Sequence, residues 1–152
     1  MQDTRFTTSA IGVLRLAQQS AAVLGHSYVG SEHLLLGLAR QSQTPAGRLL
    51  NSRGLSAPAL QETIISLTGT GRPGAAPSQG LTPRCRQVIE LAVMESGRMG
   101  HKSVSSEHLL LGLLRDRSCS AARVLSGRGV DPHKLYQQVC ASLDGSGELP
   151  PV

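Results

Sequence analysis

Two carboxylates are the only acidic residues that occur at the same place in both halves of the sequence. Residues 25–40 return at 100–115 with twelve of sixteen positions identical, at an offset of 75 residues. Of the ten Asp and Glu residues, only Glu32 and Glu107 coincide under this offset. Each follows a Ser that is a good helix N-cap, so each is expected in the first turn of a helix. A negative charge there interacts favourably with the helix dipole and stabilises the helix by roughly 0.3–1 kcal/mol. This stabilisation explains both carboxylates without any ligand.

A ligand site at each Glu is the alternative explanation. Thr7 and Thr82, which also match at the offset of 75, open other helices, whose free N–H groups can hold an anion. A carboxylate beside such a helix end would bind both parts of a zwitterionic group, with phosphate on the N–H groups and guanidinium on the Glu. The candidate ligand-binding residues are therefore Thr7 with Glu32 in the first copy and Thr82 with Glu107 in the second. This hypothesis requires a Thr-capped helix start and a Glu-bearing helix start to be close in space.

Histidine and cysteine do not complete a catalytic or metal-binding pattern. His26 and His33, repeated as His101 and His108, are seven residues apart across a loop, whereas a zinc-binding HExxH helix places its histidines four apart. We expect these histidines to hydrogen-bond locally and to pack at a helix start, and we expect no metal. Cys85 lies between two arginines at a helix start, a setting that would lower its pKa, but no base accompanies it. Since neither GxSxG nor GxxxxGK[ST] occurs, the sequence predicts no catalytic residues and a binding module rather than an enzyme.

A four-helix motif written twice must position these residues. The first helix of each copy opens at Thr7 or Thr82 and the second is capped by Ser31 or Ser106. The third covers 45–52 and 120–127, and the fourth covers 57–68 and 132–143. We therefore predict an all-α fold of eight helices, arranged as two tandem pseudo-twofold four-helix repeats.

The second helix of each copy carries the block Leu-Leu-Leu-Gly-Leu and should form the buried centre of its repeat. Gly37 and Gly112 lie inside these helices at a cost of about 1 kcal/mol against Ala, which indicates close approach of another helix. The first repeat is predicted at 1–68 and the second at 82–144. A Gly/Pro-rich linker is predicted at 69–81 and the start of a C-terminal linker at 145–152.

Composition narrows the class of partner. The chain has 152 residues with a net charge of +5, and its basic residues are spread singly rather than in runs, which favours a solvated basic surface. Aromatic residues make up only 2%, which argues against a stacking platform for single-stranded nucleic acid. Three cysteines without CxxC spacing fit a reducing compartment, and no stretch has the length of a signal peptide or membrane span. We expect a cytoplasmic protein that binds neither nucleic acid nor membrane.

The duplicated motif Gly-His…Ser-Glu-His-Leu-Leu-Leu-Gly-Leu, with Arg5-Phe6-Thr7 before the first copy and Leu81-Thr82-Pro83-Arg84 before the second, resembles the Clp N-terminal domain. The resemblance covers roughly residues 3–144 and looks closest to ClpC-type unfoldase subunits. It implies a domain that docks protein substrates and adaptors for an AAA+ ring, which feeds a ClpP-like peptidase. ATP and Mg²⁺ would belong to the parent AAA+ modules, and no cofactor is expected in this domain.

The resemblance also implies a receptor for phosphoarginine, a degradation mark, at Thr7, Glu32, Thr82 and Glu107. The second copy departs from the family pattern, since Ser105 stands where the first copy has Gly30.

Three alternatives to this function remain open. One is a free-standing regulator of a Clp unfoldase or peptidase, another is nucleic-acid binding through the Arg surface, and the most distant is a metal-dependent enzyme.

Overall fold

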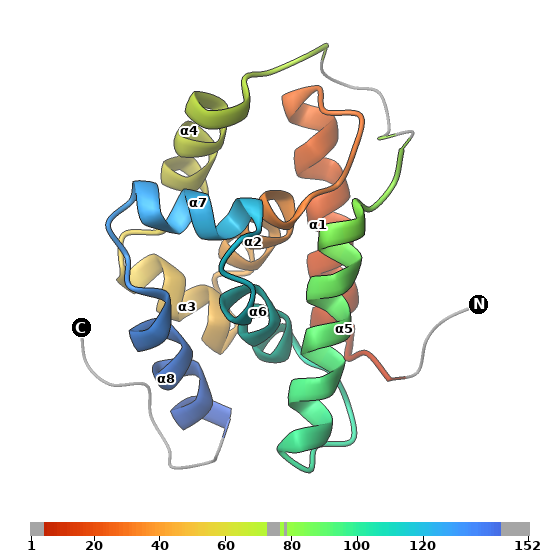
Figure 1. Ribbon diagram of the computed structural model, residues 1–152, viewed down its shortest axis with the longest axis vertical. Coiled ribbons are helices and arrows are strands. Elements are labelled where there is room, and N and C mark those ends of the chain that lie inside the picture. Colours follow the sequence, from red (N-terminus) through yellow and green to blue (C-terminus); the bar gives the residue numbers. More distant parts are fainter. Residues whose placement is uncertain (1–4, 73–76, 78, 144–152) are drawn as a thin grey trace.

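The computed structural model describes residues 5–72, 77 and 79–143 and contains only helices as regular elements within those ranges (Figure 1). The first repeat contributes α1 (Thr8–Leu24), α2 (Ser31–Arg40), α3 (Pro45–Ser52) and α4 (Ala57–Thr68). The second contributes α5 (Pro83–Arg98), α6 (Ser106–Arg115), α7 (Ser120–Gly127) and α8 (Pro132–Leu143). The all-α prediction and the bounds of the third and fourth helices of each copy are confirmed. The C-terminal linker predicted at 145–152 lies outside the described residues, as do 73–76 and 78 of the linker between the repeats.

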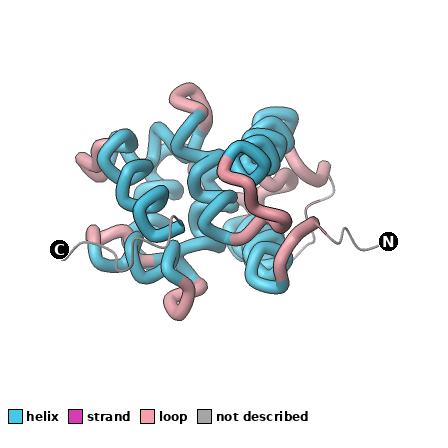
Figure 2. Tube along the Cα trace, turned by 90° about the horizontal axis from the view of Figure 1, so that it is seen from below, coloured by secondary structure: helices cyan, strands magenta, loops and turns pink. Residues whose placement is uncertain are grey.

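The two central helices are α2 and α6, and the longer helices α1 and α5 pack against them (Figures 1 and 2). The leucine blocks at 34–36 and 109–111 are fully buried, as their apolar pattern predicts. Gly37 and Gly112 admit the partner helix, because a Cβ at these positions would lie 2.7 Å from Val13 O and 2.5 Å from Val88 O. The predicted role of both glycines in close helix approach is therefore confirmed.

The two repeats interleave rather than stand side by side as separate bundles. Helix α4 packs on α7 of the other repeat, and α3 packs on α6 and α8. Isolated β-bridges between Phe6 and Val104 and between Val29 and Leu81 also join segments of the two repeats. The core is consequently one aliphatic cluster that draws on both copies. None of the described helices has the length and apolar character needed to cross a membrane.

The helix starts follow the predicted caps in α1 and α5 but not in α2 and α6. Thr7 and Thr82 are N-caps whose side chains accept the N–H groups of Ala10 and Cys85. In α2 and α6 the N-cap is one residue earlier than predicted, at Gly30 and Ser105. The reason is that the histidine at the third helical position reaches back to the N-cap backbone and closes the turn there. Ser31 and Ser106 are thereby released for other contacts.

Candidate functional site

The four candidate residues do not pair within each repeat as predicted. Helix α1 has 17 residues, and the end of α2 lies beside its start, where Gln41 Nε2 donates to Ser9 O at 2.9 Å, so the starts of the two helices lie at opposite ends of a hairpin. Glu32 lies nine residues before Gln41, so at 1.5 Å per residue about 14 Å of helix separates Glu32 from the start of α1. The pairing of Thr7 with Glu32, and likewise that of Thr82 with Glu107, is therefore wrong.

Backbone hydrogen bonds bring the helix starts together across the repeats instead. The N–H of Thr82 donates to Val29 O (3.0 Å), and the N–H of Val29 donates to Gly80 O (2.8 Å). The start of α2 thus lies beside the start of α5. In the same way the N–H of Thr7 donates to Val104 O (3.0 Å), which places the start of α1 beside that of α6. The geometry required for a ligand site, a Thr-capped start next to a Glu-bearing start, is met by Thr82 with Glu32 and by Thr7 with Glu107.

Glu32 is a buried carboxylate with an unused oxygen. Its side chain lies in a residue that is 2% exposed, and Oε1 has no hydrogen-bond partner. Among the residues that the structure describes, Tyr28 alone hydrogen-bonds to this carboxylate, from its OH to Oε2 at a long 3.5 Å. Burial, followed by the charge of Glu32, raises the pKa of Tyr28. Since a buried polar atom is normally paired, the free oxygen of Glu32 is an exception that calls for an explanation.

The backbone at Gly30 allows this placement of the Glu32 carboxylate. A Cβ at position 30 would lie 2.1 Å from Glu32 Oε1, so the carboxylate folds over the glycine and takes the space of a side chain. The equivalent residue in the second repeat is Ser105, whose hydroxyl caps α6 by accepting the N–H of His108. Glu107 cannot fold back in the same way over a residue with a side chain.

The carboxylate of Glu107, unlike that of Glu32, is hydrogen-bonded to the other repeat. Its Oε2 accepts the N–H of Ala46 in the first turn of α3 at 3.0 Å and the hydroxyl of Ser106 at 2.9 Å. The corresponding N–H in the other repeat belongs to Ala121 in α7, and it donates to Ser31 Oγ at 3.0 Å rather than to Glu32. The two repeats therefore cap each other's third helix with different side chains. Because Ser31 supplies the cap for α7, Glu32 is left available.

The chain carries a recognisable family signature over most of its length. The family model for the Clp repeat (R) N-terminal domain matches residues 5–128. The chain belongs to this Clp N-terminal repeat family. The match spans all of the first repeat and most of the second, so both candidate helix-start pairs lie within it.

Several curated Clp proteins are similar to this Clp repeat domain. The negative regulator of genetic competence ClpC/MecB of Bacillus subtilis is 44% identical over 144 residues, which cover 95% of this chain and 18% of that protein. The chloroplastic chaperone protein ClpC1 of Oryza sativa is 40% identical over 144 residues, 95% of this chain and 16% of that protein. The chain thus spans less than a fifth of the length of these relatives.

Solved Clp N-terminal domains have the same fold. The N-terminal domain of the chaperone ClpD from Arabidopsis thaliana superposes with a TM-score of 0.77 at 30% identity, covering 91% of this chain and 97% of that one. The ClpV N-domain in complex with a VipB peptide has a TM-score of 0.69 at 18% identity, covering 95% of this chain and 90% of that one. This more distant likeness shows the fold alone.

The duplicated histidines of the Clp repeats form short hydrogen-bond chains, as their local packing predicts. Gly69 O accepts from His26 Nε2 at 2.8 Å, so His26 carries its proton on Nε2. His26 Nδ1 then accepts from His33 Nε2 at 2.7 Å, and His33 Nδ1 accepts the N–H of Gly30 at 2.9 Å. Both rings are neutral in this arrangement. Burial is the main reason that the pKa of His33 is lowered to about 4, and the second is repulsion from His26 when that ring is protonated.

The prediction of a lowered pKa for Cys85 is wrong. The side chain is fully buried, and burial raises its pKa to about 12, with the negative charge of Glu32 as the second cause. The thiol is therefore inert rather than nucleophilic. The proximity of this charge also places Glu32 next to the first turn of α5. Within the described ranges no three His, Cys, Asp or Glu side chains gather as a metal site would require.

Sequence comparison between the repeats missed the buried acids Glu95 and Asp116 because neither has an acidic counterpart. Glu95 is 3% exposed and takes the place of Ser20 in the first copy. It binds Arg98, Tyr136 and Arg115, so that α5, α6 and α8 are tied together. Burial acts to raise the pKa of Glu95, but the hydrogen bonds from Tyr136 and Arg98 outweigh it and lower the pKa below its ordinary value. All its oxygens are used, so Glu95 is a structural anchor.

Proposed function

We propose that this domain docks proteins for a ClpC-type unfoldase and that its ligand is an arginine-phosphorylated segment bound at Glu32 and Thr82. The observation that supports this proposal most directly is the free, buried oxygen of Glu32 beside the start of a second helix. A carboxylate left unpaired at the expense of stability is typical of a binding site rather than of a structural contact.

Phosphoarginine matches the two halves of this site. Its guanidinium would donate to the carboxylate of Glu32 in the bidentate manner that arginine prefers. Its phosphate would lie at the positive end of the α5 dipole, within reach of the Thr82 hydroxyl and the N–H of Arg84, which has no partner inside the helix because it lies in the first turn. Arginine without phosphate would satisfy only Glu32, so the site should prefer the modified residue.

The second site is proposed to be weaker. Glu107 already accepts two hydrogen bonds, one of which holds the start of α3. A guanidinium that bound there would have to displace the N–H of Ala46 or share the oxygen with it. Phosphoarginine should consequently occupy the Glu32 site first, although both repeats carry the Thr and Glu of the motif.

Calorimetric titration tests the receptor function. Phosphoarginine should bind the wild-type domain saturably and arginine much more weakly, and Glu32→Gln should abolish the difference. Thr82→Val should weaken phosphoarginine binding, whereas Glu107→Gln, the matched variant in the other repeat, should leave the first site intact. Equal affinity for arginine and phosphoarginine in the wild-type domain would refute the receptor proposal.

The role within a larger machine follows from the same proposal. The domain would collect substrates and adaptor proteins for AAA+ modules that use ATP and Mg²⁺, and these modules would thread the substrates into a ClpP-like peptidase. The ClpV N-domain complex shows that a domain of this fold can hold a peptide. Fusing this domain to a ClpC-type ring in place of its own N-domain tests the role. Degradation of an arginine-phosphorylated model substrate should be retained and should fall with Glu32→Gln.

A further inference from the structure

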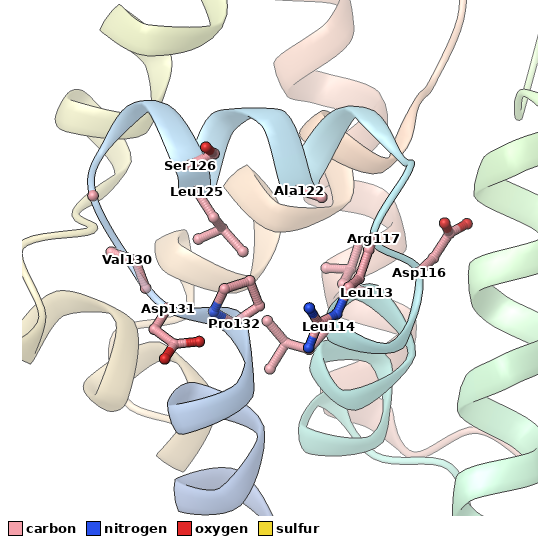
Figure 3. Close-up of a pocket in the computed structure, with 11 residues that line it drawn as sticks. Leu113, Leu114, Asp116, Arg117, Ala122, Leu125, Ser126, Val130, Asp131 and Pro132 are labelled. Carbon is pink, nitrogen blue, oxygen red and sulfur yellow. The ribbon is translucent and has the colours of Figure 1, made fainter.

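A pocket of about 420 Å³ lies between the end of α6, the helix α7 and the start of α8 (Figure 3). Its floor is aliphatic and is formed by Leu113, Leu114, Leu125, Val130 and Pro132. The pocket lies at the end of α6 opposite to Glu107 and belongs to the second repeat alone. It is therefore separate from the helix-start pairs described above.

The first repeat provides an internal comparison, because α3 packs more tightly there than α7 does in the second repeat, although a pocket of about 430 Å³ lies beside it between Arg40 and the start of α4. Gly47 in α3 lies against the chain before it so closely that a Cβ would be 1.9 Å from Gln41 O. Asn51 adds to this close packing by donating to Ala39 O (3.2 Å) and Gly47 O (2.7 Å). The offset of 75 places Ala122 and Ser126 at these two positions in the second repeat. The Cβ of Ala122 excludes the close approach, and Ser126 is too short to bridge the same groups.

The packing of the helices agrees with this difference. Helix α3 contacts α2 extensively, whereas α7 contacts α6 much less. The N-cap of α3, Thr44, accepts the N–H of Gly47, but the N-cap of α7, Cys119, makes no side-chain cap. Ala122 and Ser126 thus replace the two residues that hold α3 close in the first repeat, and both line the apolar pocket.

The charges at the rim indicate what enters the pocket. Asp116 is occupied by Arg84 and by Ser118, and Figure 3 shows its carboxylate pointing away from the pocket. Asp131 accepts the N–H of His133 at the start of α8 through Oδ1. Arg117 is exposed, extends toward the centre of the pocket, and forms no ion pair or side-chain hydrogen bond with any residue that the structure describes. Among the described residues, the rim therefore offers one cation without an ionic partner, Arg117, together with the carboxylate of Asp131, above an aliphatic floor.

We infer that this pocket binds the C-terminal residue of a peptide that ends in an aliphatic side chain. The side chain would fill the apolar floor, and the terminal carboxylate would pair with the guanidinium of Arg117. The remaining carboxylate oxygen of Asp131 would accept a backbone N–H of the same peptide. This inference rests on the proposed docking function and deepens it, because it names a second class of protein segment that the domain recognises.

Fluorescence anisotropy with a labelled Gly-Ser decapeptide ending in Leu-Leu tests the inference. The peptide acid should bind saturably, and the same peptide with a C-terminal amide should bind at least tenfold more weakly. Arg117→Gln should weaken the acid at least tenfold and leave the amide unchanged, whereas Arg123→Gln, an exposed charge on α7 outside the pocket, should have no effect. The variant A122G/S126N, which restores the residues of the first repeat, should close the pocket and abolish binding.

Three results would overturn the inference: equal binding of acid and amide, an equal effect of Arg117→Gln on both, or free leucine binding as tightly as the peptide. The last result would assign the pocket to an amino acid instead. If A122G/S126N fails to fold, the binding of the peptide acid and the peptide amide by Arg117→Gln still tests the inference. If the wild-type domain binds phosphoarginine but not the peptide acid, only this inference is refuted. If it binds the peptide acid but not phosphoarginine, only the phosphoarginine site is refuted.

Discussion

Replacing each duplicated carboxylate with methionine should change stability in opposite directions. Methionine is unbranched and close to glutamate in length, so it removes the charge with little change in packing. In Glu32→Met the change removes a buried oxygen without a partner, whose desolvation costs roughly 1–3 kcal/mol. Against this, the favourable interaction with the helix dipole is lost, about 0.3–1 kcal/mol. We expect the free energy of unfolding to rise by about 1 kcal/mol.

In Glu107→Met the same chemical change removes a hydrogen bond from the N–H of Ala46 to a charged oxygen, worth roughly 1.5–3 kcal/mol, and leaves that N–H buried. The dipole term is lost as well, so the free energy of unfolding should fall by about 3 kcal/mol. Urea denaturation of both variants beside the wild type measures the two changes. In thermal unfolding, each kcal/mol should move the Tm by roughly 2–4 °C. Equal loss of stability in the two variants would show that both carboxylates serve only the helix dipole, and the reasoning for a free Glu32 would be refuted.

Three further predictions concern packing, pH and reactivity. Gly112→Ala should destabilise the fold by about 2 kcal/mol, because the added Cβ meets backbone atoms of α5. Gly97→Ala should stabilise it by up to about 1 kcal/mol, because this helical site has open space. Urea denaturation compares the two variants. The pKa of His33 is about 4 in the folded protein and 6.5 in the unfolded chain, so the unfolded chain takes up the proton first as the pH falls. The contribution of His33 to the free energy of unfolding should therefore be complete above pH 6.5 and fall by up to about 3 kcal/mol as the pH drops to 4. A free energy of unfolding that stays constant over this range would contradict the neutral histidine chain. Iodoacetamide at pH 8 should modify Cys140, which is half-buried, and spare Cys85, as peptide mass mapping of the native protein can show.

The fold follows from the sequence to a large extent because the repeat is an internal comparison. Helical spacing of apolar residues and Pro or Thr at helix starts predict the bounds of the third and fourth helices of each copy and the starts of α1 and α5, and the leucine blocks predict the centre. The caps of α2 and α6 were displaced by one residue because a histidine side chain competes for the N-cap backbone. Propensity rules for Ser and Thr do not include that contact.

The candidate site was predicted as a set of residues but not as a geometry. Matching positions in the two copies select Glu32 and Glu107, yet they give no information on how the copies face each other. The length of α2 already separates Thr7 from Glu32, and the crossed bridges at Val29 and Val104 decide the actual partners. These bridges are long-range backbone contacts, which leave no periodic signal in the sequence.

The asymmetry between the two copies depends on differences that are visible only once the contacts are known. Gly30 and Ser105 differ in the sequence, but the folded carboxylate of Glu32 explains why the difference matters. The exchange of Gly47 for Ala122 likewise has no meaning until the close approach in the first repeat is seen. Cys85 shows the opposite case, since neighbouring arginines suggested a reactive thiol and burial overrides them.

An NMR titration of the ¹⁵N-labelled domain with phosphoarginine tests the crossed site most directly. If Glu32 and the start of α5 form the receptor, the largest shift changes should occur together at the amides of Glu32, Arg84 and Cys85, with small changes at the start of α1. Glu32→Gln should remove them. Shift changes centred on the first turn of α1, with the start of α5 unaffected, would contradict the assignment of the site to Glu32 and Thr82.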